Sequence, residues 1–407
     1  MKPRLKMSLF KHQEVARDFA LSHPYHICGL EMGLGKSATA LAAACVVGGK
    51  TLAVVPAFLR RNWKEEIEKF TEGLDITVIG YSELKKFLAT SKERYQFVIA
   101  DEAHYLKNHK AQRTELFHGL VESWKPTHLM LMSGTPIKNR VSEYWSLLQL
   151  CYYGRHFSDF EPFDRMFYKF CNTFSYERSF EVNGFPIVRF DGVKNVEYLK
   201  TLIKPVYIRQ RAKDVLDLPE TIDTNIMSKN STKFDADLQK AYELFQLNEK
   251  DPAYMSIKAA NALAKISDTI QLVEDMLAQD RKVVVFTCHR ESAKQLAERF
   301  KVKAITGQVD SDDRHMIISE FNLAPAGVLV ATIGAASVGF NLTSANYMVF
   351  NDFPFVPADL EQARKRIHRI GAKSTCFYYY MFTSEFDKDL FDMINRKTRD
   401  IEKVVEV

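Results

Sequence analysis

Short apolar runs alternate with amphipathic stretches from about residue 26 to residue 150. Runs with the length and composition of strands lie at Tyr25–Leu30, Thr51–Val55, Asp75–Ile79, Phe97–Ala100 and His128–Met132. Between these runs, Lys36–Val47 and Asn62–Phe70 have helical patterns. Strands that alternate with helices of this length are typical of a doubly wound parallel sheet. The chemistry of such a sheet is expected at the carboxyl ends of its strands.

A second alternating pattern begins after residue 280. It predicts strands at Lys282–Thr287, Lys303–Ile305, Gly327–Ala331, Tyr347–Asn351 and Cys376–Phe382. It predicts helices at Arg290–Phe300, Asp312–Phe321, Ala358–Ile370 and Asp387–Val405. The fold class expected from both patterns is α/β, with two similar halves in series.

The chain between the two halves has a different composition. Residues 151–205 hold 14 Phe or Tyr residues and a Gly-Phe-Pro turn at 184–186. We interpret them as an aromatic-cored insertion on the first domain, with a nucleic-acid stacking surface as the alternative. The segment 206–225 is expected to cross between the halves, and 233–280 is helical in pattern. The expected division is therefore a first domain at 1–210, a linker and helical segment at 211–280, and a second domain at 281–407.

Composition adds little to this picture. The 407 residues suggest two or three domains, and the net charge of +5 favours an anionic partner only mildly. Six scattered cysteines without metal-ligand spacing are expected to be reduced thiols. We found no signal-peptide pattern and no apolar run near the roughly 18 residues needed to cross a bilayer. A soluble cytosolic or nuclear protein is therefore expected.

A glycine-rich turn follows the first apolar run. It reads Gly29-Leu-Glu-Met-Gly-Leu-Gly-Lys-Ser37 and departs from the strict phosphate-loop pattern, because Leu30 stands where that pattern has its first glycine. Its position between a strand and an Ala-rich helix is nevertheless the expected one. Backbone N–H groups of such a turn wrap phosphates, Lys36 would neutralise their charge, and the Ser37 hydroxyl would bind Mg²⁺. An ordinary glycine turn before a helix is the alternative.

Two adjacent carboxylates end the run Phe97–Ala100. Asp101 would complete the shell of the metal ion, and Glu102 would polarise the attacking water. A solvated strand end is the alternative, but it gives no reason for two acids and a His at this point. Together with the glycine-rich turn, this pair predicts an ATPase.

Two further motifs add to this chemistry. Leu131–Pro136 reads as a strand followed by a small polar turn, whose Ser133 and Thr135 could relay the state of the nucleotide to a neighbouring domain or to nucleic acid. Arg366 and Arg369 are spaced i, i+3, so a helix would place both on one face, as an arginine fork that stabilises phosphoryl transfer. The alternatives are an ordinary Gly-Pro turn and a generic basic helix face.

The ordered set of motifs resembles superfamily 2 helicase-like ATPases, and its wording resembles their Swi/Snf-type branch. The matching segments are Phe10–Gln13, Glu31–Ser37, Val55–Pro56 with Asn62–Trp63, Asp101–Asn108, Ser133–Asn139, Glu143–Leu148, Val284–Thr287, Gly307–Arg314, Gly339–Thr343 and Gln362–Gly371. There are also departures. Glu31 and Ser37 replace the commoner Asp and Thr, Ala372 replaces a Gln, and Arg209–Val215 fits the twin-Arg pattern only loosely.

The resemblance implies two RecA-like domains in tandem with a nucleotide cleft between them. It implies ATP and Mg²⁺ as cofactors and DNA as the partner. The catalytic residues would be Lys36, Asp101, Glu102, Arg366 and Arg369, with Ser37 and Asp101 at the metal ion. The nucleotide would be bound by Gln13, Glu31, Met32, Gly33, Leu34, Gly35, Lys36, Ser37 and Gly339. DNA would be contacted by Pro56, Asn62, Ser133, Gly134, Thr135, His289 and Thr332.

Three functions remain open at this point. The first is an ATP-dependent DNA translocase or helicase on duplex, forked or branched DNA, a compact monomeric motor like the annealing and fork-remodelling enzymes of this branch. The second is an RNA helicase of the DEAH type, against which the Lys107-Asn108 extension and the wording of Gln362–Gly371 argue. The third is an inactive nucleic-acid-binding scaffold, against which the joint presence of the five catalytic residues argues.

Overall fold

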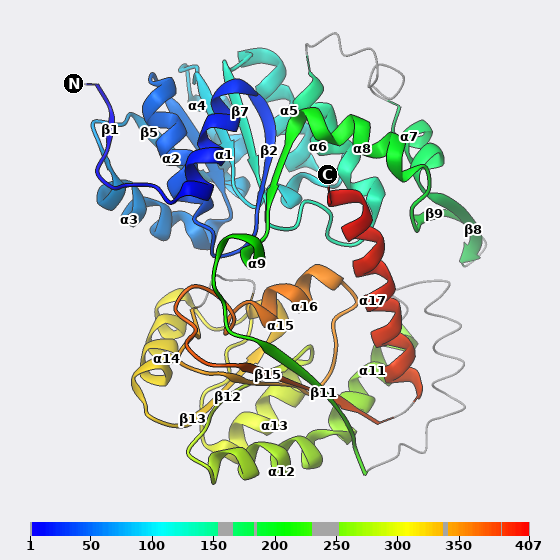
Figure 1. The fold of residues 1–407 in the computed structure, drawn as a ribbon. Coiled ribbons are helices and arrows are strands. Elements are labelled where there is room, and N and C mark those ends of the chain that lie inside the picture. Colours follow the sequence, from blue (N-terminus) through cyan, green and yellow to red (C-terminus); the bar gives the residue numbers. More distant parts are fainter. Residues whose placement is uncertain are drawn as a thin grey trace. The chain divides into compact units, whose positions relative to one another are not determined.

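The computed structural model describes residues 2–153, 166–182, 185–229, 252–336, 341–383 and 385–406. The chain forms two compact units (Figure 1). One consists of Met1–Arg178, Arg189–Leu216 and Arg399–Val407, and the other of Ser179–Val188 and Asp217–Thr398. Most of the segment expected as a linker and helical region therefore lies in the second unit.

The first unit is built on a six-stranded sheet in which every strand pair is parallel. Its strands, in spatial order, are β10 (Tyr207–Gln210), β2 (Tyr25–Leu30), β7 (His128–Met132), β6 (Phe97–Ala100), β3 (Thr51–Val55) and β5 (Ile76–Gly80). The expected strands are confirmed, with a shift of one residue at β5. All residues of β2, β3 and β6 are buried, as expected for strands covered on both faces.

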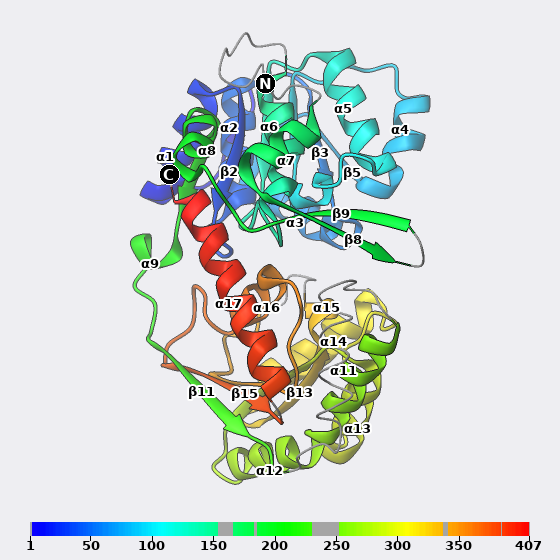
Figure 2. The ribbon, with the colours of Figure 1, turned by 90° about the vertical axis from the view of Figure 1, so that its right-hand side faces the viewer.

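Helices cover both faces of this sheet (Figure 2). Helices α1 (Lys11–Ser22), α2 (Lys36–Val47) and α3 (Arg60–Phe70) pack against one another on one face. Helices α4 (Leu84–Thr90), α5 (Gln112–Trp124) and α6 (Tyr144–Tyr152) contribute to the core on the other face. A short antiparallel pair, β1 (Arg4–Leu5) with β4 (Thr71–Glu72), completes the amino-terminal region.

The helices of the aromatic-rich segment are part of the first unit's main core rather than of a separate small core. The segment contains α7 (Phe167–Phe174), the paired strands β8 (Tyr176–Val182) and β9 (Phe185–Asp191), and α8 (Val196–Ile203). Of the paired strands, Ser179–Val188 belongs to the second unit. Phe170 and Phe174 are fully buried in the same cluster as the sheet and α5, which supports the packing interpretation. The first residue of the expected Gly-Phe-Pro turn, Gly184, lies outside the described residues. The short helix α9 (Ala212–Val215) follows β10.

The second unit contains a five-stranded sheet, again parallel throughout. In spatial order its strands are β11 (Thr221–Met227), β15 (Cys376–Phe382), β14 (Tyr347–Phe350), β12 (Lys282–Thr287) and β13 (Gly327–Thr332). One face is covered by α11 (Pro252–Ala264), α12 (Ile266–Leu277) and α13 (Arg290–Phe300). The other face has α14 (Ser311–Leu323), α15 (Ile333–Ala336), α16 (Pro357–Arg364) and α17 (Glu385–Val405). The two sheets are the two RecA-like domains that the sequence led us to expect.

Two expected elements of the second unit are shorter than predicted by two residues or more, and the strand expected at Tyr347–Asn351 ends one residue early, at Phe350. Of Lys303–Ile305, only Ile305 pairs with the sheet, through a single bridge to Ala331, because a turn begins at Thr306. The helix expected at Ala358–Ile370 ends at Arg364. The carbonyl of Arg364 accepts a hydrogen bond from the Tyr378 hydroxyl, and that of Arg366 accepts one from the backbone of Leu342. Besides these tertiary bonds, the backbone N–H groups of Arg366 and Ile367 bond to carbonyls three residues earlier, rather than four as in a continuing α-helix, so α16 ends in a turn.

In the described part of the chain, no helix combines the length and apolar character that a membrane crossing requires.

Candidate nucleotide-binding site

The phosphate loop lies between β2 and α2, at the carboxyl edge of the first sheet. Gly33 and Gly35 have positive φ angles of 87° and 75°, which glycine adopts without strain. Gly35 is the N-cap of α2, so Lys36 and Ser37 form the first turn of a 12-residue helix. The N–H groups of such a turn lack helical partners and point into the loop, where an anion can accept their hydrogen bonds.

Lys36 is folded over this loop. Its Nζ atom is 3.1 Å from the Leu30 carbonyl oxygen and 3.4 Å from that of Glu31. Gly134, just after β7, packs against the same groups. A Cβ atom at position 134 would lie 3.3 Å from the Met32 nitrogen and 3.4 Å from Lys36 Nζ. The turn of Leu131–Pro136 is therefore in close contact with the phosphate loop.

Gln13 fixes the loop from the side of α1. Its Oε1 accepts a hydrogen bond from the Phe10 nitrogen at 3.0 Å, and its Nε2 donates to the Leu34 carbonyl at 3.1 Å. A Cβ atom at Gly35 would collide with Nε2 of Gln13. The Gln13 amide, expected to bind the nucleotide, thus holds the loop in this structure.

Asp101 lies directly after β6 and is 6% exposed. Its Oδ2 accepts a hydrogen bond from Trp63 Nε1 at 2.8 Å, and its Oδ1 accepts one from the Glu102 nitrogen at 2.9 Å. Burial, followed by the charge of Glu102, raises the pKa of Asp101 to about 6, and the indole of Trp63 and the charge of Lys36 oppose this rise. A buried carboxylate in this state gains from a nearby cation.

Glu102 has a left-handed backbone, with φ of 49° and ψ of 52°. Its Oε2 lies 3.2 Å from Nδ1 of His104, and the same ring nitrogen lies 3.3 Å from the Ser133 hydroxyl. Burial lowers the pKa of His104 despite the neighbouring Glu102, so the ring is neutral at pH 7. His104 therefore connects the acidic pair to the turn of Leu131–Pro136, which fits the relay role expected for Ser133.

A carboxylate that we did not single out in the sequence lies beside Ser37. Burial raises the pKa of Glu66 on α3, and a hydrogen bond with the Ser37 side chain opposes this shift. Ser37 and Asp101 offer oxygen ligands alone, the type that Mg²⁺ prefers together with phosphate oxygens and water. Within the described ranges, no cluster of three or more His, Cys, Asp or Glu side chains could hold a metal ion without such help.

Glu31 is turned toward the end of β10. Its carboxylate accepts a hydrogen bond from the Ala212 nitrogen at 3.1 Å and lies 3.5 Å from the Arg209 guanidinium. The sequence suggested Glu31 as a nucleotide ligand, but these contacts attach the loop to the start of the crossing segment. Arg209 belongs to the loosely matching twin-Arg motif, which was the one signal for this contact in the sequence.

The residues expected to contact DNA are in different environments. Asn62 is exposed, Thr135 and His289 are half-buried, and Pro56 and Thr332 are buried. Ser133 is 0% exposed, and its hydroxyl accepts a hydrogen bond from the Thr135 nitrogen. DNA contacts at Ser133 and Gly134 do not fit this burial, because both residues pack against the protein's own loops. Gly339 lies outside the described residues.

The two arginines of the last motif belong to the second unit and do not share a helix face. Both follow the end of α16, where Arg366 lies in the turn after Arg364. Arg366 is 1% exposed, whereas Arg369 is half-buried and burial lowers its pKa. The expected fork on one helix face is therefore wrong, because the tertiary bonds described above end the helix.

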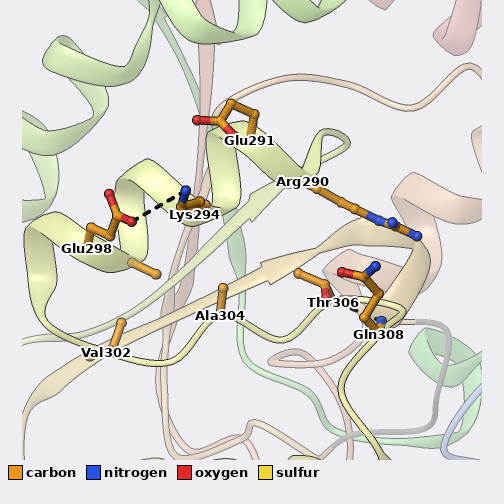
Figure 3. Close-up of a pocket in the computed structure, with 9 residues that line it drawn as sticks. Arg290, Glu291, Lys294, Glu298, Val302, Ala304, Thr306 and Gln308 are labelled. Atoms are coloured by element: carbon orange, nitrogen blue, oxygen red, sulfur yellow. Dashed lines mark hydrogen bonds and ion pairs between the residues drawn. The ribbon is translucent and has the colours of Figure 1, made fainter.

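The second unit also has a surface hollow of about 390 Å³ beside α13 (Figure 3). Arg290 extends from the start of α13 toward Thr306 and Gln308, while Lys294 lies 3.9 Å from Glu298 on the same helix. Acidic and basic side chains alternate along this wall, so its charge favours neither an anionic nor a cationic ligand.

The two parallel sheets define an α/β protein with two RecA-like domains. A model of the SNF2-related domain matches residues 72–285, more than half of the chain, and a model of the helicase conserved C-terminal domain matches residues 264–371. The chain therefore belongs to the SNF2-related family.

Several known proteins are similar along nearly the whole chain. A SWI/SNF-related matrix-associated actin-dependent regulator of chromatin subfamily A-like protein 1 homolog from Caenorhabditis elegans is 28% identical over 98% of this chain and 62% of its own length. The human DNA annealing helicase and endonuclease ZRANB3 is 26% identical over 97% of this chain and 40% of its own length. The chain thus spans only part of these relatives. The Sulfolobus solfataricus SWI2/SNF2 ATPase core in complex with dsDNA is 19% identical, with a TM-score of 0.44, and the match covers 100% of this chain and 99% of that one.

Proposed function

We propose that the chain is an ATP-dependent motor that moves along duplex, forked or branched DNA. One observation carries the ATPase part of the proposal. Lys36, Ser37, Asp101 and Glu102 meet at one edge of the first sheet, and each has the chemical group that its role requires. Membership in the SNF2-related family supports DNA as the activating partner.

The roles of these residues follow from their chemistry. The Lys36 ammonium would leave the Leu30 and Glu31 carbonyls and bind the terminal phosphates of ATP. Ser37 and Asp101 would hold Mg²⁺, which supplies charge neutralisation at the phosphates when bound. Glu102 would orient the hydrolytic water. The neutral His104 next to it would transmit the change in the state of the nucleotide to Ser133.

The second unit would contribute Arg369 to the transition state of hydrolysis. A guanidinium supplied from a second domain stabilises the charge that develops during phosphoryl transfer. Arg369 suits this role better than Arg366, because it is half-buried rather than fully enclosed. Hydrolysis would then depend on closure of a cleft between the domains, and alternate grip on the DNA backbone would produce stepping.

Steady-state ATP hydrolysis with duplex DNA, single-stranded DNA or RNA as the activator tests this function. We expect low activity without nucleic acid and stimulation by duplex DNA of any sequence, because backbone contacts carry no sequence information. The DNA concentration needed for activation should rise steeply with salt. Stimulation by RNA alone would favour the RNA helicase alternative, and absence of hydrolysis under all conditions would favour the scaffold.

The preferred substrate is a branch point, which would place the motor in branch migration or fork remodelling during replication, recombination or repair. The name of the human relative, a DNA annealing helicase, supports this choice. A linear duplex and a four-way junction of equal length should be titrated while phosphate release is measured. Equal stimulation by both would contradict the branch-point preference and leave the motor intact.

A further inference from the structure

Helix α3 touches both residues expected at the metal ion. Trp63 donates its indole N–H to Asp101, and Glu66, three residues later, lies near the Ser37 side chain, which opposes the rise in the pKa of Glu66 caused by burial. Residues three apart lie on the same face of a helix, so one face of α3 serves both contacts. The fold explains this position. Helix α3 follows β3, and β3 pairs directly with β6, whose end carries Asp101.

The geometry at Ser37 suits metal binding. The Ser37 hydroxyl can donate its proton to the neighbouring Glu66 carboxylate, which would leave its oxygen lone pairs free for a cation. One carboxylate oxygen of Glu66, Oε2, is buried and has no hydrogen-bond partner among the described residues. Such an oxygen can accept a hydrogen bond from a water molecule, and Mg²⁺ usually keeps several waters in its shell. A buried acceptor without a partner is unfavourable unless a ligand supplies the donor.

The geometry at Asp101 is complementary. The Trp63 side chain is 1% exposed and among the largest fully buried side chains of the chain. Its indole therefore has little freedom, and the hydrogen bond of 2.8 Å fixes the orientation of the Asp101 carboxylate. Groups that hydrogen-bond to metal ligands in this way orient them and tune their affinity.

We propose that Trp63 and Glu66 are positioning residues for a divalent cation at Ser37 and Asp101. Trp63 orients the carboxylate, and Glu66 orients the hydroxyl and offers Oε2 to a cation-bound water. This inference rests on the proposed function, because it takes Ser37 and Asp101 as the metal ligands. It also gives α3 a second role, since the exposed Asn62, an expected DNA contact, precedes Trp63 directly on the same helix.

The test measures binding rather than turnover. The affinity of the full chain for a fluorescent ADP analogue is determined with Mg²⁺ and with EDTA, and the ratio gives the gain in affinity due to the cation. We expect Glu66→Gln and Trp63→Phe each to reduce this gain roughly 10-fold and to leave the affinity in EDTA unchanged. Glu68→Gln, the same change at an exposed position of α3, is the matched control and should behave as wild type.

Each other outcome has a definite meaning. If both variants keep the wild-type gain, the inference is wrong and the proposed function stands. An equal loss of affinity in Mg²⁺ and in EDTA would show a purely structural role and would also overturn the inference. If the wild-type chain itself binds no nucleotide, or binds it without any gain from Mg²⁺, the proposed function fails as well. Thermal unfolding of each variant identifies a loss of fold, and the milder Trp63→Phe keeps an aromatic side chain in the core.

Discussion

Each sheet has a buried aspartate at the carboxyl end of a central strand, but the pKa values of the two carboxyl groups are shifted in opposite directions. Asp101 follows β6, and burial together with Glu102 raises its pKa to about 6. Asp352 follows β14 and accepts hydrogen bonds from the Thr287 hydroxyl and the Cys288 nitrogen. Although burial alone raises the pKa of Asp352, the charges of Lys258 and Lys265, the neighbouring His289 ring and the hydrogen bond from Thr287 hold it below the ordinary value.

This difference in pKa distinguishes a ligand-binding residue, Asp101, from a structural residue, Asp352, although both occupy the same kind of position in a parallel sheet. Hydrogen bonds and neighbouring positive charges within the second unit already stabilise the Asp352 carboxylate, so a bound ligand would contribute little further stabilisation. The negative charge of Asp101 is less well compensated by the protein, and a cation bound together with phosphates would supply the missing positive charge. A strand-end aspartate in a parallel sheet is thus informative about binding only together with its partners.

Among substitutions at the carboxyl edge of the first sheet, a change of Glu102 should have the largest effect on ATP hydrolysis. Glu102→Gln is expected to reduce hydrolysis by roughly two to three orders of magnitude, because the water loses its oriented acceptor, while ATP affinity stays close to wild type. Single-turnover phosphate release and equilibrium binding of ATP measure the two quantities. Near wild-type hydrolysis by this variant would remove Glu102 from the mechanism.

The second unit should contribute to turnover through Arg369 and to stability through Arg366. Arg369→Ala is expected to lower the turnover number about 10³-fold without changing the melting temperature, because the half-buried guanidinium acts only in the transition state. Arg366→Ala removes a buried charged side chain and should lower both turnover and melting temperature. Lys373→Ala, at an exposed position of the same segment, is the control. Equal changes in turnover number and melting temperature in both arginine variants would contradict the assignment of different roles to Arg366 and Arg369.

Asp352→Asn tests the structural half of the comparison. The charged carboxylate accepts several hydrogen bonds inside the second unit, so its loss should reduce the free energy of unfolding by about 3 kcal/mol at pH 7. Because the folded-state pKa lies below the ordinary value, this stabilisation is present above that value and is lost as the pH falls through the folded pKa.

The difference between wild type and Asp352→Asn in urea unfolding should therefore shrink below about pH 4. Asp275→Asn, at an exposed helix position, should be neutral. A pH-independent difference would mean that the charge of Asp352 has no part in the stability of the second unit.

Gly134→Ala should have the smallest effect. The added methyl group would crowd the Met32 nitrogen and Lys36 Nζ at 3.3 to 3.4 Å, so the loop must shift by a few tenths of an ångström. We expect nucleotide affinity to fall by a few-fold, roughly 1 kcal/mol, at unchanged stability. Gly119→Ala on α5, where an added Cβ meets no atom within 4 Å, should leave affinity unaffected. Unchanged affinity in Gly134→Ala would show that the two loops move independently.

Most of the fold could be predicted from the sequence because its strands are short apolar runs buried on both faces. Five strands of the first sheet and four of the second follow from this pattern, as do the phosphate loop and the acidic pair. The end of α16 could not be predicted, since it depends on bonds from Tyr378 and Leu342 to its carbonyls. The contact of Trp63 with Asp101 joins residues far apart in the chain, and local patterns carry no information about it. For the contact of Glu31 with Arg209, the loosely matching twin-Arg motif marks one partner but does not identify the other.

At Glu102, which has a left-handed backbone, the residue best for the backbone conformation differs from the residue required for ATP hydrolysis. A glutamate in this conformation is less favourable than a glycine by about 1 kcal/mol, partly offset by the greater freedom of glycine in the unfolded chain. Glu102→Gly would therefore cost the protein little resistance to heat and proteases, yet remove its acceptor for water, because the backbone gain offsets much of the lost contact with His104. A screen of variants for thermal survival alone would not remove inactive molecules at this position, so only selection for hydrolysis itself retains the carboxylate.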